Sequence, residues 1–165
     1  MECAALAQIG LANTTIEKAE KVESGTFNTQ RDLPPFCRVA GRIRPTADSD
    51  IRFEVWLPLK GWNRKFQGVG NGGYAGSLSI SAVAGAVRQG YSSATTDTGH
   101  QGGDAKWALG HPEKVIDFGW RAIHEMTVAG KAITKAFYGE APARSYFNSC
   151  SNGGRQALME AQRFP

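Results

Sequence analysis

The amino-acid sequence predicts an α/β fold with a largely parallel sheet, and three observations favour this class. From residue 65 onward, β-prone runs alternate with segments of helical periodicity. The chain has 165 residues, of which 41% are hydrophobic and 21% charged, as is typical of one soluble globular domain. Glycine occurs 20 times without a collagen-like period, which indicates glycine-rich turns between the elements.

Two runs in the first third of the chain alternate polar and apolar residues, as half-buried strands do. They cover 36–45 and 51–58, and the turn-like TADSD lies between them. We therefore expect an antiparallel hairpin at the edge of the sheet. KFQGVG (65–70) predicts a short strand that runs into glycines, and small apolar residues at helical spacing predict a helix over 77–90.

The longest predicted element is a helix over 115–139. Its apolar residues recur at steps of three and four, and Gly139 follows as a cap. A β-prone run at 91–97 and a polar loop at 97–114 precede it. The expected buried stripe of this helix consists of Val115, Phe118, Ala122, Met126, Ala129, Ile133 and Phe137.

A serine stands where a predicted strand meets a predicted helix. The strand covers 143–150, the helix covers 153–164, and Ser151 lies between them. Nucleophilic serines of α/β hydrolases occupy such a corner, because the tight turn exposes the hydroxyl. Glycines at 153 and 154 allow the helix to pass close to the strand. The turn also brings the N–H of Asn152 to the helix N-terminus, where it can stabilise an oxyanion.

The motif at this corner departs from the usual GxSxG. The residue two positions before Ser151 is Ser149, so the pattern is SxSxG. Serine is small enough for the turn, yet the departure weakens the motif taken alone. A serine that merely caps a helix in an ordinary βα turn is therefore the alternative.

GVGNGG (68–73) is a glycine-rich loop that supports two kinds of site. It matches the dinucleotide fingerprint GxGxxG through Gly68, Gly70 and Gly73, and Asp97 follows 24 positions after the last of them. Two predicted strands already precede the motif, however, and the loop continues beyond it. In a serine hydrolase, such a loop supplies further oxyanion N–H groups. Because the chain also carries a serine corner, we favour acyl transfer; a plain glycine turn is the remaining alternative.

A nucleophilic serine needs a base and an orienting carboxylate, and in α/β hydrolases both follow it in the chain. The fourteen residues after Ser151 contain Glu160 and no histidine. We therefore expect the chain to be an N-terminal piece of a larger protein. If no longer reading frame exists, a non-catalytic remnant of an esterase is the alternative function.

The three histidines all precede the serine. His100 lies in a loop with Asp97 and Asp104, which suits a metal or catalytic cluster but more simply a hydrogen-bonded loop anchor. His111 precedes a proline at an expected helix start, and His124 lies beside the apolar stripe of the long helix. None of them occupies the place expected of the catalytic base.

Composition excludes several classes of function. Cys3, Cys37 and Cys150 are an odd number without a CxxC motif, which argues against a zinc site and leaves one thiol over after any pairing. The net charge is only +4, and no basic run supports nucleic-acid binding. No apolar stretch approaches the ~18 residues of a membrane helix, and the N-terminus does not resemble a signal peptide.

The run CSNGGRQALMEAQRFP, at the end of the chain, resembles the nucleophile region of the tannase and feruloyl esterase family. This family also includes the enzyme that hydrolyses mono(hydroxyethyl) terephthalate. The similarity spans roughly residues 33–165, with a looser match at Cys3. Further similar segments, in the same order, are LPPFCRV, VWLPLKGWNRKFQGVGNGGYAGS, SSATTDTGH and HPEKVIDFGWRAIHEMTVAGKAI.

The resemblance implies a serine esterase of α/β-hydrolase fold that acts on small aromatic or phenolic esters. Residues 1–165 would form the N-terminal part of its catalytic domain and end just after the nucleophile elbow. Ser151 would be the nucleophile. The N–H of Asn152 and that of Gly72 or Gly73 would form the oxyanion hole.

The resemblance also implies how the cysteines pair. Cys3 and Cys37 would form an N-terminal disulfide, as in a secreted or periplasmic protein. Cys150 would pair with a cysteine beside the catalytic histidine, in a part not contained in this sequence. No cofactor or metal is expected within these residues, although the family's lid domain often holds a calcium ion. The oligomeric state is not predicted.

Overall fold

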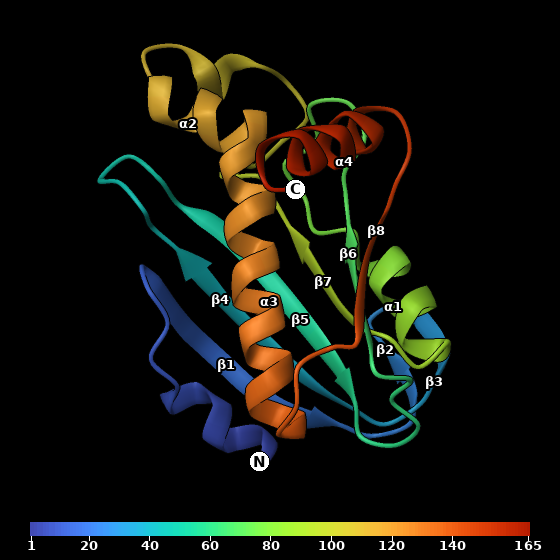
Figure 1. Cartoon of the computed structure of the whole chain (residues 1–165). Coiled ribbons are helices and arrows are strands. Elements are labelled where there is room, and N and C mark those ends of the chain that lie inside the picture. Colours follow the sequence, from blue (N-terminus) through green and yellow to red (C-terminus); the bar gives the residue numbers. More distant parts are fainter.

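A six-stranded mixed sheet forms the centre of the fold in the computed structural model, which describes residues 1–165 (Figure 1). The order of strands across the sheet is β1-β4-β5-β7-β6-β8. Neighbours from β1 to β7 run antiparallel, whereas β6 is parallel to both β7 and β8. The predicted α/β class is therefore confirmed, but the sheet is mixed rather than largely parallel, because β1, β4 and β5 add three antiparallel pairs to the two parallel ones. The strands are β1 (Thr14–Val22), β4 (Phe36–Ile43), β5 (Ile51–Pro58), β6 (Lys65–Val69), β7 (Ser92–Thr96) and β8 (Arg144–Asn148).

Helices cover both faces of the sheet and connect its parallel strands (Figure 1). The helix α1 (Ile80–Arg88) links β6 to β7, and α3 (Ala122–Tyr138) links β7 to β8. The last helix, α4 (Asn152–Arg163), follows β8. No helix is both long and apolar enough to span a lipid bilayer. The smaller elements are a ribbon of β2 (Gly25–Phe27) and β3 (Gln30–Leu33), the short helix α2 (Pro112–Ile116), and 3₁₀ turns at Cys3–Gln8 and Lys106–Ala108.

Strand β5 divides the core into two parts because its side chains alternate between the faces of the sheet. Phe53, Val55 and Leu57 belong to the larger cluster under α3, which also contains Met126. Trp56 belongs to the smaller cluster under α1. The face that carries Trp56 also carries Glu54, which is buried because it accepts hydrogen bonds from Arg38 and Trp56, so the 51–58 run is buried almost throughout.

The predicted hairpin exists, but its predicted position is wrong. Strands β4 and β5 pair antiparallel from Phe36 opposite Pro58 to Ile43 opposite Ile51. The edge of the sheet is β1, which pairs with β4, and β5 lies inside the sheet against β7. β1 escaped sequence analysis because a register shift after Ile16 breaks its alternation of polar and apolar residues.

The predicted helix 115–139 is helical throughout, but its stripe is not continuous. A π-helical turn (Asp117–Arg121) separates α2 from α3. A π turn contains about one extra residue, so it rotates the preceding turn by roughly 100° around the axis. Val115 is consequently 47% exposed rather than buried. The stripe beyond the π turn is buried at Ala122, Met126, Ala129 and Ile133, and Gly139 ends the helix with a φ of 78°.

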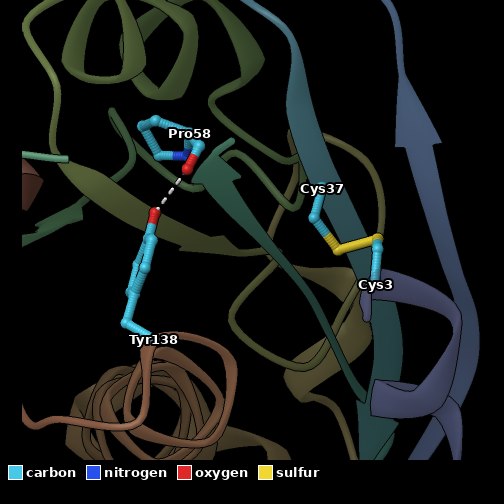
Figure 2. Close-up of a disulfide and its surroundings, with 4 residues drawn as sticks. All are labelled: Cys3, Cys37, Pro58 and Tyr138. Atoms are coloured by element: carbon cyan, nitrogen blue, oxygen red, sulfur yellow. Dashed lines mark hydrogen bonds between the residues drawn. A yellow bond between two sulfur atoms is a disulfide. The ribbon is translucent and has the colours of Figure 1, made fainter. Parts of the chain in front are cut away.

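A disulfide fixes the N-terminal 3₁₀ turn to the sheet, as the resemblance implied. Figure 2 shows Cys3 bonded to Cys37, which lies in β4, and both residues are buried. The same view shows the hydroxyl of Tyr138, at the end of α3, donating a hydrogen bond of 2.8 Å to the carbonyl of Pro58. The disulfide thus holds the N-terminal 3₁₀ turn, and the Tyr138 hydrogen bond holds the C-terminal end of α3, against the sheet. Cys150 is free and exposed.

Replacing both Cys3 and Cys37 with alanine is expected to lower the free energy of unfolding by about 4 kcal/mol. The disulfide closes a loop over a sequence separation of 34, and its loss restores chain entropy to the unfolded state. Urea unfolding of wild type and variant measures the difference. Replacing the exposed Cys150 with alanine is the control and should change stability by less than about 0.5 kcal/mol. Equal midpoints for wild type and double variant would contradict the prediction.

Candidate active site

The serine corner predicted from the sequence is present. Ser151 lies between the end of β8 and the start of α4, with φ 56° and ψ −124°. A positive φ is sterically unfavourable for a residue with a side chain and is retained where the surrounding structure enforces it. Ser151 is exposed, and its hydroxyl makes no hydrogen bond within the chain. The bend therefore presents a free hydroxyl to solvent.

Two glycines allow the backbone segments at this corner to touch. A Cβ at Gly153 would overlap the side chain of Ser149, and a Cβ at Gly70 would overlap Gln156 and approach the backbone of Gly153. The glycine-rich loop after β6 and the first turn of α4 are thus in van der Waals contact. The glycines at 70 and 153 are required by this close approach rather than by their backbone angles.

A pair of buried amide side chains joins the loop to the helix. The N–H of Asn71 donates to Oε1 of Gln156 at 3.1 Å, and Nε2 of Gln156 donates to Oδ1 of Asn71 at 3.3 Å. Nδ2 of Asn71 also donates to the carbonyls of Ser77 and Thr96. Both amide residues are at least 96% buried. We call this pair the Asn71–Gln156 clamp; it fixes the residues just before Gly72 against α4.

Three backbone amides near the corner have no acceptor in the chain. The first amide of α4 with a hydrogen bond is that of Gly153, which donates to the carbonyl of Cys150, and the N–H of Asn152 is unpaired. The N–H groups of Gly72 and Gly73 are likewise unpaired, and both glycines are exposed. Asn71, which directly precedes Gly72, contacts the first turn of α4, so the loop and the helix both bring unpaired N–H groups to the region of the corner, where they are suited to bind a developing negative charge.

The geometry disfavours the dinucleotide hypothesis. Gly68 lies within β6 and packs against Phe147, and Gly70 is closed off by α4, so neither offers its backbone to a pyrophosphate. The next helix, α1, begins only at Ile80, seven residues after Gly73. A dinucleotide fingerprint instead places its glycines at the turn that opens directly into the helix.

His100 is a loop anchor and not a catalytic base. Its Nε2 donates to the carbonyl of Tyr74 at 2.7 Å, and its ring stacks on Trp107 with centroids 4.2 Å apart. Burial lowers the pKa of His100, which keeps the ring neutral. Asp104 accepts from the N–H of Lys106 instead of joining the histidine. No three metal-ligating side chains lie close enough together to hold a metal ion.

The other two histidines also have partners away from the corner. Nδ1 of His111 lies 2.9 Å from Oδ1 of Asp48. Nδ1 of His124 lies 3.1 Å from Oε1 of Glu160, and its ring stacks on Phe164. None of the three histidines hydrogen-bonds to Ser151.

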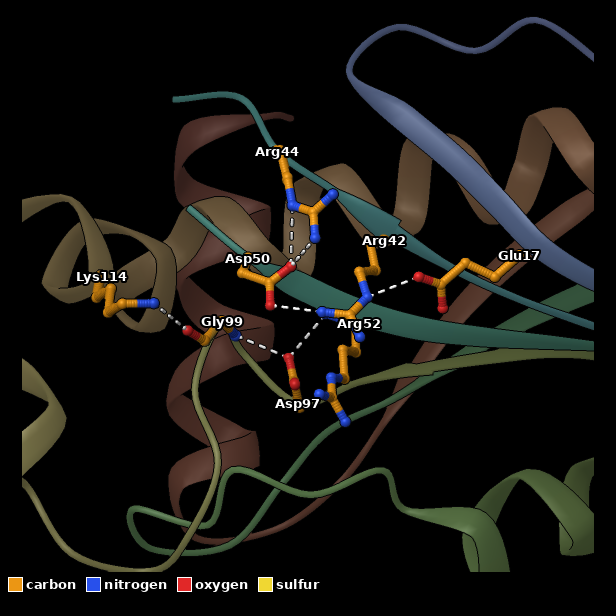
Figure 3. A network of polar contacts seen from close by, with 8 residues as sticks. All are labelled: Glu17, Arg42, Arg44, Asp50, Arg52, Asp97, Gly99 and Lys114. Atoms are coloured by element: carbon orange, nitrogen blue, oxygen red, sulfur yellow. Dashed lines mark hydrogen bonds and ion pairs between the residues drawn. The ribbon is translucent and has the colours of Figure 1, made fainter. Parts of the chain in front are cut away.

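Asp97 supports the turn that follows β7. Figure 3 shows its Oδ1 accepting from the N–H of Arg52 at 3.0 Å and from the N–H of Gly99 at 2.9 Å. Asp97 is only 3% exposed, and this burial raises its pKa to about 6 although the two hydrogen bonds lower it. The carboxylate therefore has a structural role at the end of a central strand.

Replacing Asp97 with asparagine is expected to change the pH dependence of stability. The native pKa of about 6 exceeds the usual 3.8, so the folded state binds the extra proton between these values. Asp97 therefore favours folding below pH 4, and this contribution is lost as the pH rises through 6. The Oδ1 atom of an asparagine can accept the same two hydrogen bonds, but it carries no negative charge. Relative to the variant, wild type should lose about 2–3 kcal/mol of stability between pH 4 and pH 7.5.

Urea unfolding at both pH values measures this difference. Asp104→Asn is the matched control, because Asp104 accepts from a backbone N–H two residues ahead in the same way but is exposed. Its stability difference from wild type should stay constant between pH 4 and pH 7.5. A constant difference for the Asp97 variant as well would contradict the burial argument.

Comparison with known proteins identifies the family. Residues 37–165 match the sequence model of the family described as tannase and feruloyl esterase. The chain belongs to this family. Among curated members, it is 46% identical to an uncharacterized esterase of Xanthomonas campestris pv. campestris, with 99% of this chain and 30% of the relative aligned. It is 34% identical to feruloyl esterase B of Aspergillus niger, with 96% of this chain and 32% of that relative aligned.

Solved structures of the tannase and feruloyl esterase family share this fold. Feruloyl esterase B from Aspergillus oryzae superposes with a TM-score of 0.91 at 33% identity, over 99% of this chain and 34% of that chain. Tannin acyl hydrolase from Aspergillus niger gives a TM-score of 0.73 at 27% identity, over 92% of this chain and 31% of that chain. The chain thus spans about a third of the length of the relatives that it matches.

No local sequence pattern indicates the residues that hold the two halves of the site together. The Asn71–Gln156 clamp joins positions 85 apart in the sequence. The only local sign was an amide residue inside a glycine-rich run. Arg155, which contacts the π turn, was likewise not singled out.

Proposed function

We propose that this chain carries the nucleophile and the oxyanion donors of a serine esterase. Its substrates would be esters of aromatic or phenolic acids, such as feruloyl or galloyl esters. The observation that carries the proposal is the exposed hydroxyl of Ser151 on a strained turn, fixed against a loop with unpaired amides. Membership of the tannase and feruloyl esterase family supports the substrate class.

The reaction would proceed through an acyl-enzyme. Oγ of Ser151 attacks the ester carbonyl, and the resulting oxyanion is held by the N–H of Asn152 and that of Gly72 or Gly73. Each donor contributes roughly 3–4 kcal/mol to the transition state in comparable sites. The alcohol then leaves, and water hydrolyses the acyl-enzyme to release the aromatic acid.

The base and its carboxylate would come from residues beyond these 165. All three histidines here have other partners, and the aligned relatives are about three times as long. Cys150, which is free and exposed, would pair with a cysteine beside the catalytic histidine and so join base to nucleophile. Any calcium ion would belong to a lid domain outside this chain. The Cys3–Cys37 disulfide supports a secreted or periplasmic location.

The 165-residue chain alone is expected not to turn over methyl ferulate or p-nitrophenyl esters. Without base and carboxylate, only the weak catalysis of the oxyanion donors remains. A longer protein that contains this chain, a downstream aspartate and a Cys-flanked histidine should hydrolyse the same esters. If the 165-residue chain hydrolysed these esters and Ser151→Ala abolished the activity, the proposal that the base lies outside this chain would be wrong. If the longer protein were inactive, the alternative of a non-catalytic esterase remnant would be favoured.

A further inference from the structure

Arg155, in the first turn of α4, binds one oxygen atom of Asn152 and two of the π turn. Its Nε donates to Oδ1 of Asn152 at 2.7 Å. Its two terminal nitrogens donate to the carbonyls of Gly119 at 2.6 Å and Phe118 at 3.0 Å. The guanidinium also lies over the Phe118 ring, 5.0 Å from its centroid. The side chain therefore ties the residue after the nucleophile to the π turn.

The charge of Arg155 is not neutralised by a carboxylate. All its hydrogen-bond acceptors are neutral carbonyl or amide oxygens, and it forms no ion pair. Other arginines differ: the hydrogen bonds that Arg38 donates to Glu54 raise the pKa of Arg38, and the hydrogen bond that Arg42 donates to Asp50 raises the pKa of Arg42. Burial alone lowers the pKa of Arg155, but a guanidinium remains protonated at neutral pH.

The neighbourhood of Arg155 has more donors than acceptors. Oδ1 of Asn152 is taken by the guanidinium, and its Nδ2 is buried without any partner. The backbone N–H of Asn152 is also unpaired, at the N-terminus of the 12-residue helix α4. A helix N-terminus carries a partial positive charge that adds to that of the guanidinium. Negative charge at position 151 is therefore favoured from several sides.

We propose that Arg155 is a positioning residue of the nucleophile corner, which orients Asn152 and supplies an unneutralised positive charge one helical turn after Ser151. This inference rests on the proposed function for its catalytic meaning, because the charge would stabilise the oxyanion and the serine alkoxide. The charge itself is a property of the folded chain and does not require turnover. The two proposals are therefore separable by experiment.

A thiol at position 151 measures the local charge directly. The experiment uses Ser151→Cys in the 165-residue chain with Cys150→Ala, so that the only free thiol is the reporter. Its pKa is determined from the pH dependence of the alkylation rate. We expect a value below about 8, against about 8.5 for an unperturbed thiol.

Adding Arg155→Met should raise this thiol pKa by about half a unit to one unit, because an opposite charge nearby favours the thiolate. Arg155→Lys keeps the charge and should keep the pKa low. Arg163→Met is the matched control: Arg163 stacks on Trp120 in the last turn of the same helix, 4.2 Å from the ring centroid. It is about 12 Å further along the axis and should leave the thiol pKa unchanged.

Two results would overturn the proposal. One is a thiol pKa at or above about 8 with Arg155 intact, and the other is an unchanged pKa in a folded Arg155→Met variant. Circular dichroism checks folding, and Arg155→Gln replaces the methionine variant if that variant does not fold. The first result is obtained without any substitution of Arg155. An inactive longer protein with a low, Arg155-dependent thiol pKa would refute the proposed function and leave this inference standing.

Kinetics show whether the charge serves catalysis. In whichever form hydrolyses methyl ferulate, Arg155→Met should lower kcat about tenfold to a hundredfold and leave KM within about threefold. This split is expected because the charge acts on the oxyanion and not on the bound ester. Arg155→Lys should recover part of kcat. A loss confined to KM would contradict the positioning role.

Discussion

Ser151→Ala is expected to lower kcat/KM for aromatic esters by about 10⁴-fold to 10⁶-fold in the form of the protein that turns them over. The reason is the loss of the oxygen that forms the acyl-enzyme in the proposed mechanism. Its exposed hydroxyl has no other hydrogen-bond partner in the chain, so its removal should barely affect folding. Steady-state rates with methyl ferulate measure the change, and the free energies of unfolding of variant and wild type should agree within about 0.5 kcal/mol.

Ser149→Ala is the matched control for this experiment. It removes a hydroxyl from the same corner, two residues before Ser151, where the side chain faces Gly153. Its activity should stay within about threefold of wild type, since the backbone of the turn is unchanged. A Ser151→Ala variant that keeps a tenth of the activity would rule out this serine as the nucleophile.

Gly153→Ala is expected to destabilise the protein by about 2–4 kcal/mol and to reduce activity with it. The new Cβ would overlap both Cβ and Oγ of Ser149 and would lie 3.2 Å from the carbonyl of Asn71. Because Cβ of Ser149 is fixed by the backbone, a change of rotamer cannot relieve the contact. The helix must instead move away from the glycine loop, which separates the two sets of amides.

Two further variants make this test specific. Gly154→Ala changes the adjacent glycine, whose Cβ would meet no atom within 4 Å, and should stabilise α4 by about 0.5–1 kcal/mol. Ser149→Gly removes the obstacle, so combining it with Gly153→Ala should recover at least half of the lost stability. Urea unfolding of wild type, Gly153→Ala, Ser149→Gly and the double variant gives the coupling energy between the two positions. Equal effects of alanine at 153 and 154 would contradict the packing argument.

Local patterns predicted the elements of the fold well where the chain obeys a simple period. The hairpin strands β4 and β5 and the buried stripe from Ala122 to Ile133 follow directly from alternation or helical spacing. Predictions failed where one extra residue shifts the alternation of a strand or the apolar stripe of a helix. The bulge after Ile16 concealed β1, and the π turn exposed Val115. The position of the hairpin within the sheet depends on long-range pairing, which no local pattern contains.

At the candidate site, too, local features could be predicted from the sequence, whereas long-range contacts could not. The strained corner at Ser151 was predictable because its small neighbours are adjacent in sequence. The role of Cys37 as partner of Cys3 followed only from family resemblance, since three cysteines allow several pairings. The contacts of Arg155 join residues more than thirty positions apart and depend on a π turn that no spacing indicated.

The Asn71–Gln156 clamp has a consequence for how the proposed site meets its substrate. Two hydrogen bonds between buried amides make the glycine loop and α4 a single rigid unit. The dipoles that would face an oxyanion are thus oriented during folding, before any ester arrives. Little reorganisation energy remains for the reaction itself, which is the condition under which fixed dipoles surpass water as a solvent for charge.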